Sequence, residues 1–318
     1  MSNYFVGVDL GGTKILTAVA DQKGNILGDF KVATEVEKGE EYIINDIEKS
    51  IRSVAANAKL NLEEIKRIGV GSPGPLSIKK GIVYETSNLP FKNFPIVEML
   101  ESKINIPVVL ENDANAAALG EKLFGSGIDS KVMVYITIST GIGGGLIFGE
   151  KVFHGSNDGA GEVGHMIIEP SGPPCGFGQH EGCLEAMASG TAIVRNVKSE
   201  LKSNPEKRLK KYNGKIEDIN GYNIAKAARN GDELAKEVYQ EAGRYLGIGV
   251  ANLINLFNPD TIVFGGGVMK AKELFWTDMI KSVKKNALSA SANDCEFFEA
   301  VLGDNTGVIG AIAVAIKG

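Results

Sequence analysis

The 318-residue sequence contains no long hydrophobic run and only three cysteines. No segment approaches the roughly 20 apolar residues that span a bilayer. The opening stretch MSNYFVGVDL also lacks the basic start of a secretory signal. The cysteines, Cys175, Cys183 and Cys295, are too few and odd in number for a disulfide framework. We therefore expect a cytoplasmic protein with no membrane partner.

The sequence also has little excess of either charge. Its net charge is -5. Charged residues make up 23% of the chain and hydrophobic residues 43%, which is the balance of a globular protein. The basic run at residues 207–211 (KRLKK) reads as a solvated helix face, so we expect no nucleic-acid partner. The length suits two domains of ordinary size.

Glycine, by contrast, is abundant, with 40 residues. Three glycine-rich turns follow predicted strands: DLGGTK at residues 9–14, STGIGGG at 139–145 and FGGGV at 264–268. Glycine lets backbone N–H groups approach an anion and accepts positive φ. One such turn is weak evidence for a phosphate site, because turns between strands are often glycine-rich. Three together indicate nucleotide binding.

Two common nucleotide motifs compete with this interpretation. GVDLGGTK at residues 7–14 is not a Walker A loop, because threonine precedes the lysine. A Rossmann dinucleotide loop fits poorly, because DLGGTK leads into a second strand rather than a helix and GIGGGL lacks the third glycine in register. The nicotinamide alternative is disfavoured but stays open.

Strand and helix patterns alternate along the chain, which predicts an α/β protein. Two similar meanders, each a strand, a glycine-rich turn and a second strand, suggest a duplicated folding unit. One further strand is expected to run into a Gly-Pro loop and another into a helix. The last third of the chain reads mainly as helices. The expected strands lie at 4–8, 15–20, 106–112, 131–138, 146–149, 261–268 and near 296–302, and a further strand begins at 65 and runs into a Gly-Pro loop by residue 76. The expected helices include 40–60, 113–125 and 307–318.

Carboxylates follow two of these strands. Asp9 ends the first strand beside glycine N–H groups, where it would hold Mg²⁺ through water, although a turn-forming aspartate is the alternative. Asn112 and Asp113 lie at a strand-to-helix junction, and both residue types also cap helices. The polar cluster ENDAN favours a site for sugar hydroxyls. Asp113 would be the general base that accepts the proton of the attacking hydroxyl.

A second polar group follows the second meander. GAGEVGH places Glu162 three residues before His165, and Glu185 follows Cys183 in GCLE. Paired carboxylate oxygens suit adjacent sugar hydroxyls, and a histidine can donate to one while its other nitrogen faces elsewhere. A lone histidine is more often a satisfied core residue, but the glycines around His165 are poor core composition.

Taken in order, these motifs resemble the ROK (repressor, open reading frame, kinase) family and, within it, the bacterial glucokinases. The resemblance covers nearly the whole chain. Each motif is modest alone, and the ordered set is specific. The motifs are DLGGTK, GSPGPL, SNLP at residues 87–90, ENDANAAALGE, TGIGGGLI, GAGEVGH, GCLE, NPDTIVFGGGV and LGDNTGVIGA.

The resemblance implies a two-lobed actin-like ATPase fold with a ribonuclease-H-like core in each lobe. ATP and Mg²⁺ would lie in the cleft between the lobes, which closes on the sugar. We expect one lobe at residues 1–116, completed by a C-terminal helix at about 304–318, and a second at 117–303. By match to the family motifs, the phosphate residues are Gly11, Gly12, Thr13, Lys14, Thr140 and Gly141, the adenosine is bordered by Gly265, Gly266 and Gly267, and the sugar residues are Gly74, Asn112, Asp113, Glu162, His165 and Glu185.

The sequence departs from the family at its zinc motif, CxCGxxGC with a histidine upstream. Phe177 stands where the second cysteine is expected, and one extra residue precedes Cys183. His180 lies three residues before Cys183, a spacing of the family's fructokinase-like branch. A Cys₂His₂ zinc site within the loop 165–185, with the ligands His165, Cys175, His180 and Cys183, is therefore expected. A metal-free loop is the alternative.

We predict a kinase that transfers phosphate from ATP to the 6-hydroxyl of a hexose, with glucose as first choice, in carbohydrate metabolism and glycolysis. A fructokinase or N-acetylmannosamine kinase is the alternative among enzymes, since fold analogy does not select the sugar. A sugar-responsive regulator without catalysis is the alternative outside them. Asp113 counts against it, as does a first strand too close to Met1 for a preceding DNA-binding region. The resemblance favours a dimer or larger homo-oligomer.

Overall fold

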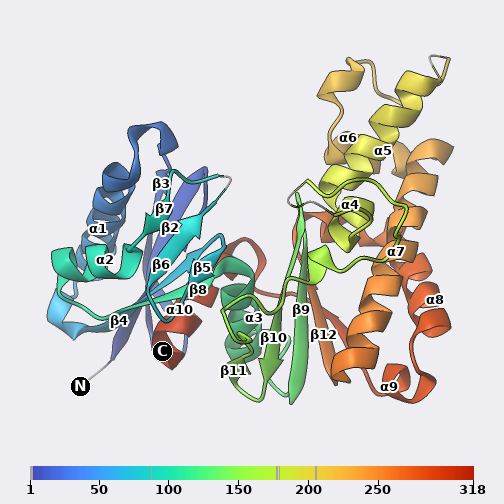
Figure 1. The fold of residues 1–318 in the computed structure, drawn as a ribbon. Coiled ribbons are helices and arrows are strands. Elements are labelled where there is room, and N and C mark those ends of the chain that lie inside the picture. Colours follow the sequence, from blue (N-terminus) through green and yellow to red (C-terminus); the bar gives the residue numbers. More distant parts are fainter. Residues whose placement is uncertain (1–2, 87, 177, 179, 205) are drawn as a thin grey trace. The chain divides into compact units, whose positions relative to one another are not determined.

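The computed structural model describes residues 3–86, 88–176, 178, 180–204 and 206–318 (Figure 1). Its contacts divide the chain into two compact units. Unit 1 consists of Met1–Tyr135, Gly145–Gly161 and Ala300–Gly318, and unit 2 consists of Ile136–Gly144 and Glu162–Glu299.

Unit 1 is built on a five-stranded mixed sheet with the order β3-β2-β1-β4-β8. The strands are β1 (Tyr4–Leu10), β2 (Lys14–Asp21), β3 (Ile26–Ala33), β4 (Ile65–Ser72) and β8 (Val108–Asn112). β1, β2 and β3 form an antiparallel meander, whereas β4 pairs in parallel with both β1 and β8. The carboxyl ends of β1, β4 and β8 therefore lie at one edge of the sheet.

Helices cover both faces of this sheet (Figure 1). On one face, α1 (Glu40–Asn57) and α2 (Ile96–Ile104) bury an aliphatic core against the strands. On the other face lies α10 (Thr306–Lys317). A Cβ built on Gly7 would lie 2.6 Å from the carbonyl oxygen of Val308. Glycine in β1 thus allows the C-terminal helix to lie directly on the sheet.

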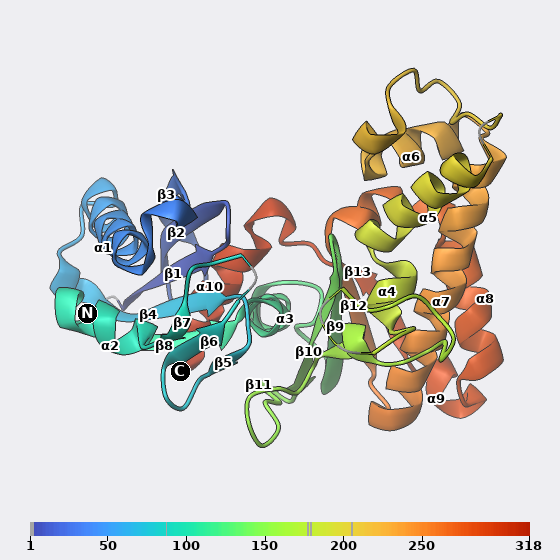
Figure 2. The same ribbon diagram turned by 45° about the horizontal axis from the view of Figure 1, so that its top comes forward.

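The helix α3 (Asp113–Phe124), which follows β8, packs beside α10 (Figures 1 and 2). A Cβ on Gly310 would lie 2.5 Å from the carbonyl oxygen of Ala116, so the two helix backbones are in close contact. The domain boundary expected between residues 116 and 117 falls inside α3, all of which belongs to unit 1. The packing of α3 against α10, which the local sequence does not encode, assigns α3 to unit 1.

A small antiparallel sheet in unit 1 is absent from the sequence prediction, as is α2. It consists of β5 (Leu76–Ser77), β6 (Ile82–Glu85) and β7 (Lys92–Phe94). Strands of two to four residues are too short to show a period in the sequence.

The third sheet has the order β11-β10-β9-β12-β13, and two of its strands run from one unit into the other. The strands are β9 (Val132–Ile138), β10 (Ile142–Phe148), β11 (Lys151–Val152), β12 (Thr261–Gly265) and β13 (Glu296–Glu299). The helices of unit 2 are α4 (Leu184–Ala188), α5 (Gly190–Ser203), α6 (Gly221–Arg229), α7 (Glu233–Phe257), α8 (Trp276–Asn286) and α9 (Ser289–Asn293). α7 and α8 lie side by side (Figure 2).

The structure confirms both predicted meanders, the strand-to-helix junction at β8 and α3, and the closing helix α10. Among the described residues, no helix has both the length and the apolar character to cross a membrane. Ser87 of the SNLP motif lies outside the described residues.

Candidate functional site

The predicted base is presented by the junction of β8 and α3 in unit 1. The Oδ1 atom of Asn112 accepts hydrogen bonds from the backbone N–H groups of Ala114, at 2.9 Å, and Asn115, at 3.3 Å. Asn112 is therefore the N-cap of α3, as its capping alternative predicted. A Cβ on Gly74 would lie 3.3 Å from the side-chain Nδ2 atom of Asn112, so these two predicted sugar residues are neighbours. Asp113 follows at the first position of the helix.

Behind this junction lies a pair that the sequence did not reveal. Glu111 is buried, and its Oε2 atom lies 2.7 Å from Nε2 of His154. Its Oε1 atom accepts from the backbone N–H of Asn112 at 2.9 Å and from Nδ2 of Asn115 at 3.1 Å. The hydrogen bond to Glu111 raises the pKa of His154 above its usual value, against the opposing effect of burial. Forty-three residues separate the partners, so no local signal joins them.

The first glycine-rich turn, between β1 and β2, carries the predicted magnesium residue. Burial raises the pKa of the Asp9 carboxyl, and the positive charge of Lys14 opposes this shift. A Cβ on Gly307 would lie 2.5 Å from a carboxylate oxygen of Asp9, so this glycine keeps the space beside Asp9 open. The turn itself is closed by a bond from the Gly11 N–H to the Lys14 carbonyl, at 3.0 Å. Thr34, which the sequence did not single out, donates its hydroxyl to the Gly11 carbonyl at 2.7 Å.

In unit 2, the second glycine-rich turn contacts Glu185. The backbone N–H of Ile142 donates to Oε2 of Glu185, and a side chain at Gly141 would overlap that carboxylate. Glu162 immediately precedes a short 3-10 helix, Val163–His165, and its carbonyl accepts from the His165 N–H at 3.1 Å. Two of the predicted sugar residues, Glu162 and His165, are thus held in one local turn.

Cysteine and histidine side chains gather in the loop before α4. The potential ligand atoms of His165, Cys175, His180 and Cys183 all lie within 4.8 Å of one another. The Nε2 atom of His180 is buried and has no partner among the described residues. Burial also raises the pKa of the Cys183 thiol. Phe177, the departure from the family motif, lies outside the described residues.

These four groups fit a tetrahedral cation, because the donor set is the Cys₂His₂ set that zinc prefers. A bound cation would satisfy the orphan nitrogen of His180. It would also favour the thiolate of Cys183 over the thiol that burial favours.

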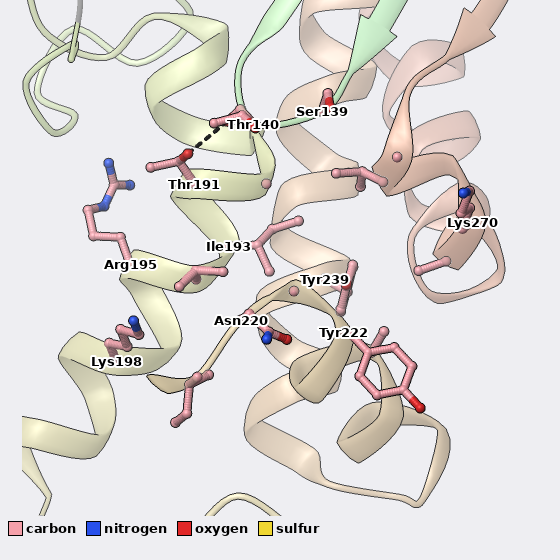
Figure 3. A pocket seen from close by; sticks show the side chains of 18 of the residues that line it. Ser139, Thr140, Thr191, Ile193, Arg195, Lys198, Asn220, Tyr222, Tyr239 and Lys270 are labelled. Carbon is pink, nitrogen blue, oxygen red and sulfur yellow. Dashed lines mark hydrogen bonds between the residues drawn. The ribbon is translucent and has the colours of Figure 1, made fainter. Parts of the chain in front are cut away.

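A cavity of about 930 Å³ lies in unit 2, a volume that suits a nucleotide (Figure 3). Its wall combines the second glycine-rich turn, the length of α5 and α6, Tyr239 of α7 and the segment after β12. Of the predicted nucleotide residues, Thr140 and Gly267 line it, whereas Gly141, Gly265 and Gly266 are not among the lining residues. The turn and the adenosine-bordering segment therefore meet in one cavity.

The start of α5 is joined to the glycine-rich turn. The Gly190 N–H donates to the Ser139 carbonyl at 2.8 Å. The Thr191 hydroxyl donates to the Thr140 carbonyl, also at 2.8 Å (Figure 3). Sequence reasoning missed Gly190 and Thr191, although the Ser-Gly-Thr run is a typical helix start. The described lining residues include five cations and no carboxylate, which suits a polyphosphate. The five are Arg195, Lys198, Lys202, Arg229 and Lys270.

Comparison with known proteins extends these observations. The ROK family model matches residues 5–317. A glucokinase of Streptomyces coelicolor is 37% identical over 314 residues, covering 98% of this chain and 96% of that protein. A xylose repressor of Caldicellulosiruptor bescii is 31% identical over 316 residues, covering 98% of this chain and 78% of the repressor.

Among solved structures, a ROK family glucokinase from Streptomyces griseus in complex with glucose and AMPPNP is 35% identical, with a TM-score of 0.81. The match covers 99% of this chain and 100% of that one. The mixed sheets flanked by helices confirm the α/β class, and the likeness confirms the actin-like ATPase fold that the resemblance implied.

Proposed function

This chain belongs to the ROK family, and on that premise we propose that it is an ATP-dependent kinase that phosphorylates glucose at its 6-hydroxyl. The observation that carries the proposal is the likeness to the Streptomyces griseus glucokinase, which was solved with glucose and the ATP analogue AMPPNP. That likeness extends over 99% of this chain at 35% identity.

In the proposed reaction, Asp113 accepts the proton of the sugar hydroxyl as that hydroxyl attacks the γ-phosphorus of ATP. The bond from that phosphorus to the bridging oxygen breaks, and ADP leaves. The position of Asp113 supports this role, because it begins α3 directly after the N-cap Asn112. Its Oδ1 atom accepts from the backbone N–H of Ala114 at 2.7 Å, which helps to hold the carboxylate in place. The residues proposed to bind the sugar are Gly74, Asn112, Glu162, His165 and Glu185.

The cavity of unit 2 is proposed to hold the nucleotide, with the glycine-rich turn at Thr140 beside the phosphates. Mg²⁺ would neutralise charge on the phosphates during transfer. Asp9 fits as its protein partner, since burial makes an isolated carboxylate at this position unfavourable and a cation would compensate its charge.

We propose a structural role for zinc at the Cys/His cluster. Four protein ligands close a tetrahedral shell and leave no position for an activated water. The metal would fix the ring of His165, whose other nitrogen would then face a sugar hydroxyl, and would hold the chain that leads into Glu185. A cytoplasmic location and a homodimer or larger assembly complete the proposal.

The proposal is tested with a coupled assay that supplies ATP, Mg²⁺ and, in turn, glucose, mannose, fructose and N-acetylmannosamine. We expect the highest kcat/KM for glucose. A higher value for fructose or N-acetylmannosamine would reassign the acceptor to the corresponding family branch.

The Asp113→Asn variant, purified in parallel, serves as the control for contaminating kinases. Binding of sugars without turnover of any of them would favour a sugar-responsive regulator, which the similarity to a xylose repressor makes the second candidate.

A further inference from the structure

The segment that follows β11, residues 153–161 of unit 1, is anchored at two points within that unit. His154 is joined to Glu111 at the end of β8. Four residues later, the Oδ2 atom of Asp158 accepts from the backbone N–H of Ile78 at 2.9 Å and from the Ser77 hydroxyl at 3.3 Å. A segment held at both points has little freedom relative to the junction of β8 and α3.

Both carboxylate oxygens of Glu111 take part in hydrogen bonds, one toward the β11 side and one toward the junction of β8 and α3. Oε2 pairs with His154, whereas Oε1 holds the backbone N–H of Asn112 and the side-chain amide of Asn115. These bonds reach the last residue of the strand and the first turn of the helix. Asp113 lies between those two residues. Glu111 therefore holds the backbone N–H before the proposed base and the side-chain amide two residues after it.

The orientation of Asn115 shows that Glu111 controls this junction. Asn115 is 2% exposed as a residue, and its Oδ1 atom is buried without a partner among the described residues. The reverse orientation would point Oδ1 at the Glu111 carboxylate, where two acceptors repel. The bond to Glu111 therefore sets the amide even though it leaves another atom unsatisfied.

Glu111 itself requires a compensating charge. Its residue exposure is 5%, and a buried carboxylate is strongly unfavourable unless it is paired. Its ionic partner in the described part of the chain is His154, whose Nε2 atom lies 2.7 Å from Oε2 of Glu111. Among the described residues, the charges that act on His154 are those of Glu111 from β8 and Asp158 from its own segment, and both are acidic.

We propose that His154 is a positioning residue for phosphoryl transfer: its charged ring holds Glu111, which in turn holds the junction that presents Asp113. The inference rests on the proposed kinase function and adds a residue to it. Loss of the His154 proton removes the compensating charge from Glu111. The junction then loosens, and activity falls in alkaline solution through a group that does not touch the substrate.

The test compares His154→Gln, His154→Ala and Glu111→Gln, with the exposed Lys151→Gln on the same hairpin as the matched control. Glucose kcat and KM are measured from pH 5.5 to 9.5. In the parent we expect kcat to fall on the alkaline side, with a midpoint above the usual histidine value of about 6.5. Lys151→Gln should reproduce the parent profile.

His154→Gln carries no charge at any pH, so we expect its kcat to lie near the alkaline value of the parent throughout, with no further fall between pH 6.5 and 9. His154→Ala leaves Glu111 unpaired, and we expect kcat to drop about 10- to 100-fold, the scale of a misplaced catalytic group. A change in the glucose KM that is smaller than the fall in kcat would show that positioning, rather than sugar binding, is lost. Glu111→Gln should remove the same alkaline limb.

Parallel thermal unfolding and nuclear magnetic resonance titration of the three histidine rings complete the design. A parent-like profile in His154→Gln and Glu111→Gln would overturn the proposal, as would a loss of melting temperature with unchanged kcat. If His154→Ala does not fold, these two variants still decide the question. A parent that turns over no hexose would instead reject the kinase function itself, and the positioning role with it.

Discussion

The Oε2 atom of Glu185 accepts a hydrogen bond from the backbone N–H of Ile142 at 2.9 Å. This bond joins the start of α4, just after Cys183, to the glycine-rich turn that lines the cavity of unit 2. The carboxylate fills the space where a side chain at Gly141 would stand. Glu185 therefore braces a predicted phosphate turn, in addition to the sugar contact that the family resemblance implies.

This relationship gives a first prediction. Glu185→Ala removes the acceptor for Ile142, so the turn loosens and we expect the KM for ATP to rise several-fold together with the KM for glucose. Glu185→Gln keeps an oxygen that accepts from Ile142 and should restore the ATP value while the glucose value stays raised. Steady-state kinetics with each substrate varied in turn measure both. An unchanged ATP KM in the alanine variant would contradict the bracing role.

The second prediction concerns the proposed base. Asp113→Asn keeps the shape of the side chain but removes its ability to accept a proton, so kcat should fall about 10²- to 10⁴-fold. Glucose affinity, measured by calorimetry with a non-hydrolysable ATP analogue, should change little. Helix α3 should stay intact, since Asn112 caps it. Turnover within threefold of the parent would exclude Asp113 as the base.

The third prediction links stability to magnesium at Asp9. The pKa of Asp9 is raised by burial, so its folded-state value exceeds the unfolded one. Such a group favours folding fully below its unfolded pKa and loses that contribution as pH rises through the folded pKa. At neutral pH the buried charge therefore lowers the free energy of unfolding, and Lys14 offsets only part of this cost.

Asp9→Asn should consequently be more stable than the parent at pH 7 and lose this advantage in acid, where the parent's carboxyl is protonated. The same variant should lose activity and the thermal stabilisation that Mg²⁺ with ATP gives the parent. Urea unfolding at pH 4 and pH 7, with and without Mg²⁺ and ATP, measures both effects. Equal stabilisation of the two proteins by Mg²⁺ and ATP would remove Asp9 from the magnesium site.

The fourth prediction is that protein purified without a metal-affinity tag contains one zinc per chain. His180→Ala should lower the zinc content and weaken glucose binding before it affects phosphoryl transfer, because a closed shell of four protein ligands acts only through the residues it holds. Cys295→Ala is the matched control, since Cys295 is also buried but lies outside the cluster.

Elemental analysis and glucose calorimetry are the measurements. Zinc well below one per chain in the parent would reject the site. Full zinc with unchanged glucose affinity in His180→Ala would remove His180 from it.

Much of the fold was predictable because it depends on patterns among neighbouring residues. The two meanders, the junction at Asn112 and Asp113, and the helix α10 each follow from apolar periodicity and from the residues that begin and end such elements. The short strands β5 to β7 were missed because two to four residues carry no measurable period. The place of α3 in unit 1 was missed because it depends on the contact of Ala116 with Gly310.

The sequence by itself determined the α/β class, the family and the residue types available for chemistry, because motif order and strand-turn-helix patterns are properties of neighbouring residues. Tertiary structure decided which of those residues meet. It paired Glu111 with His154, brought Glu185 onto the turn before Ile142, and gathered His165 and His180 with two cysteines. Such pairings depend on burial and on distances between segments far apart in the chain, and neither quantity is contained in local sequence.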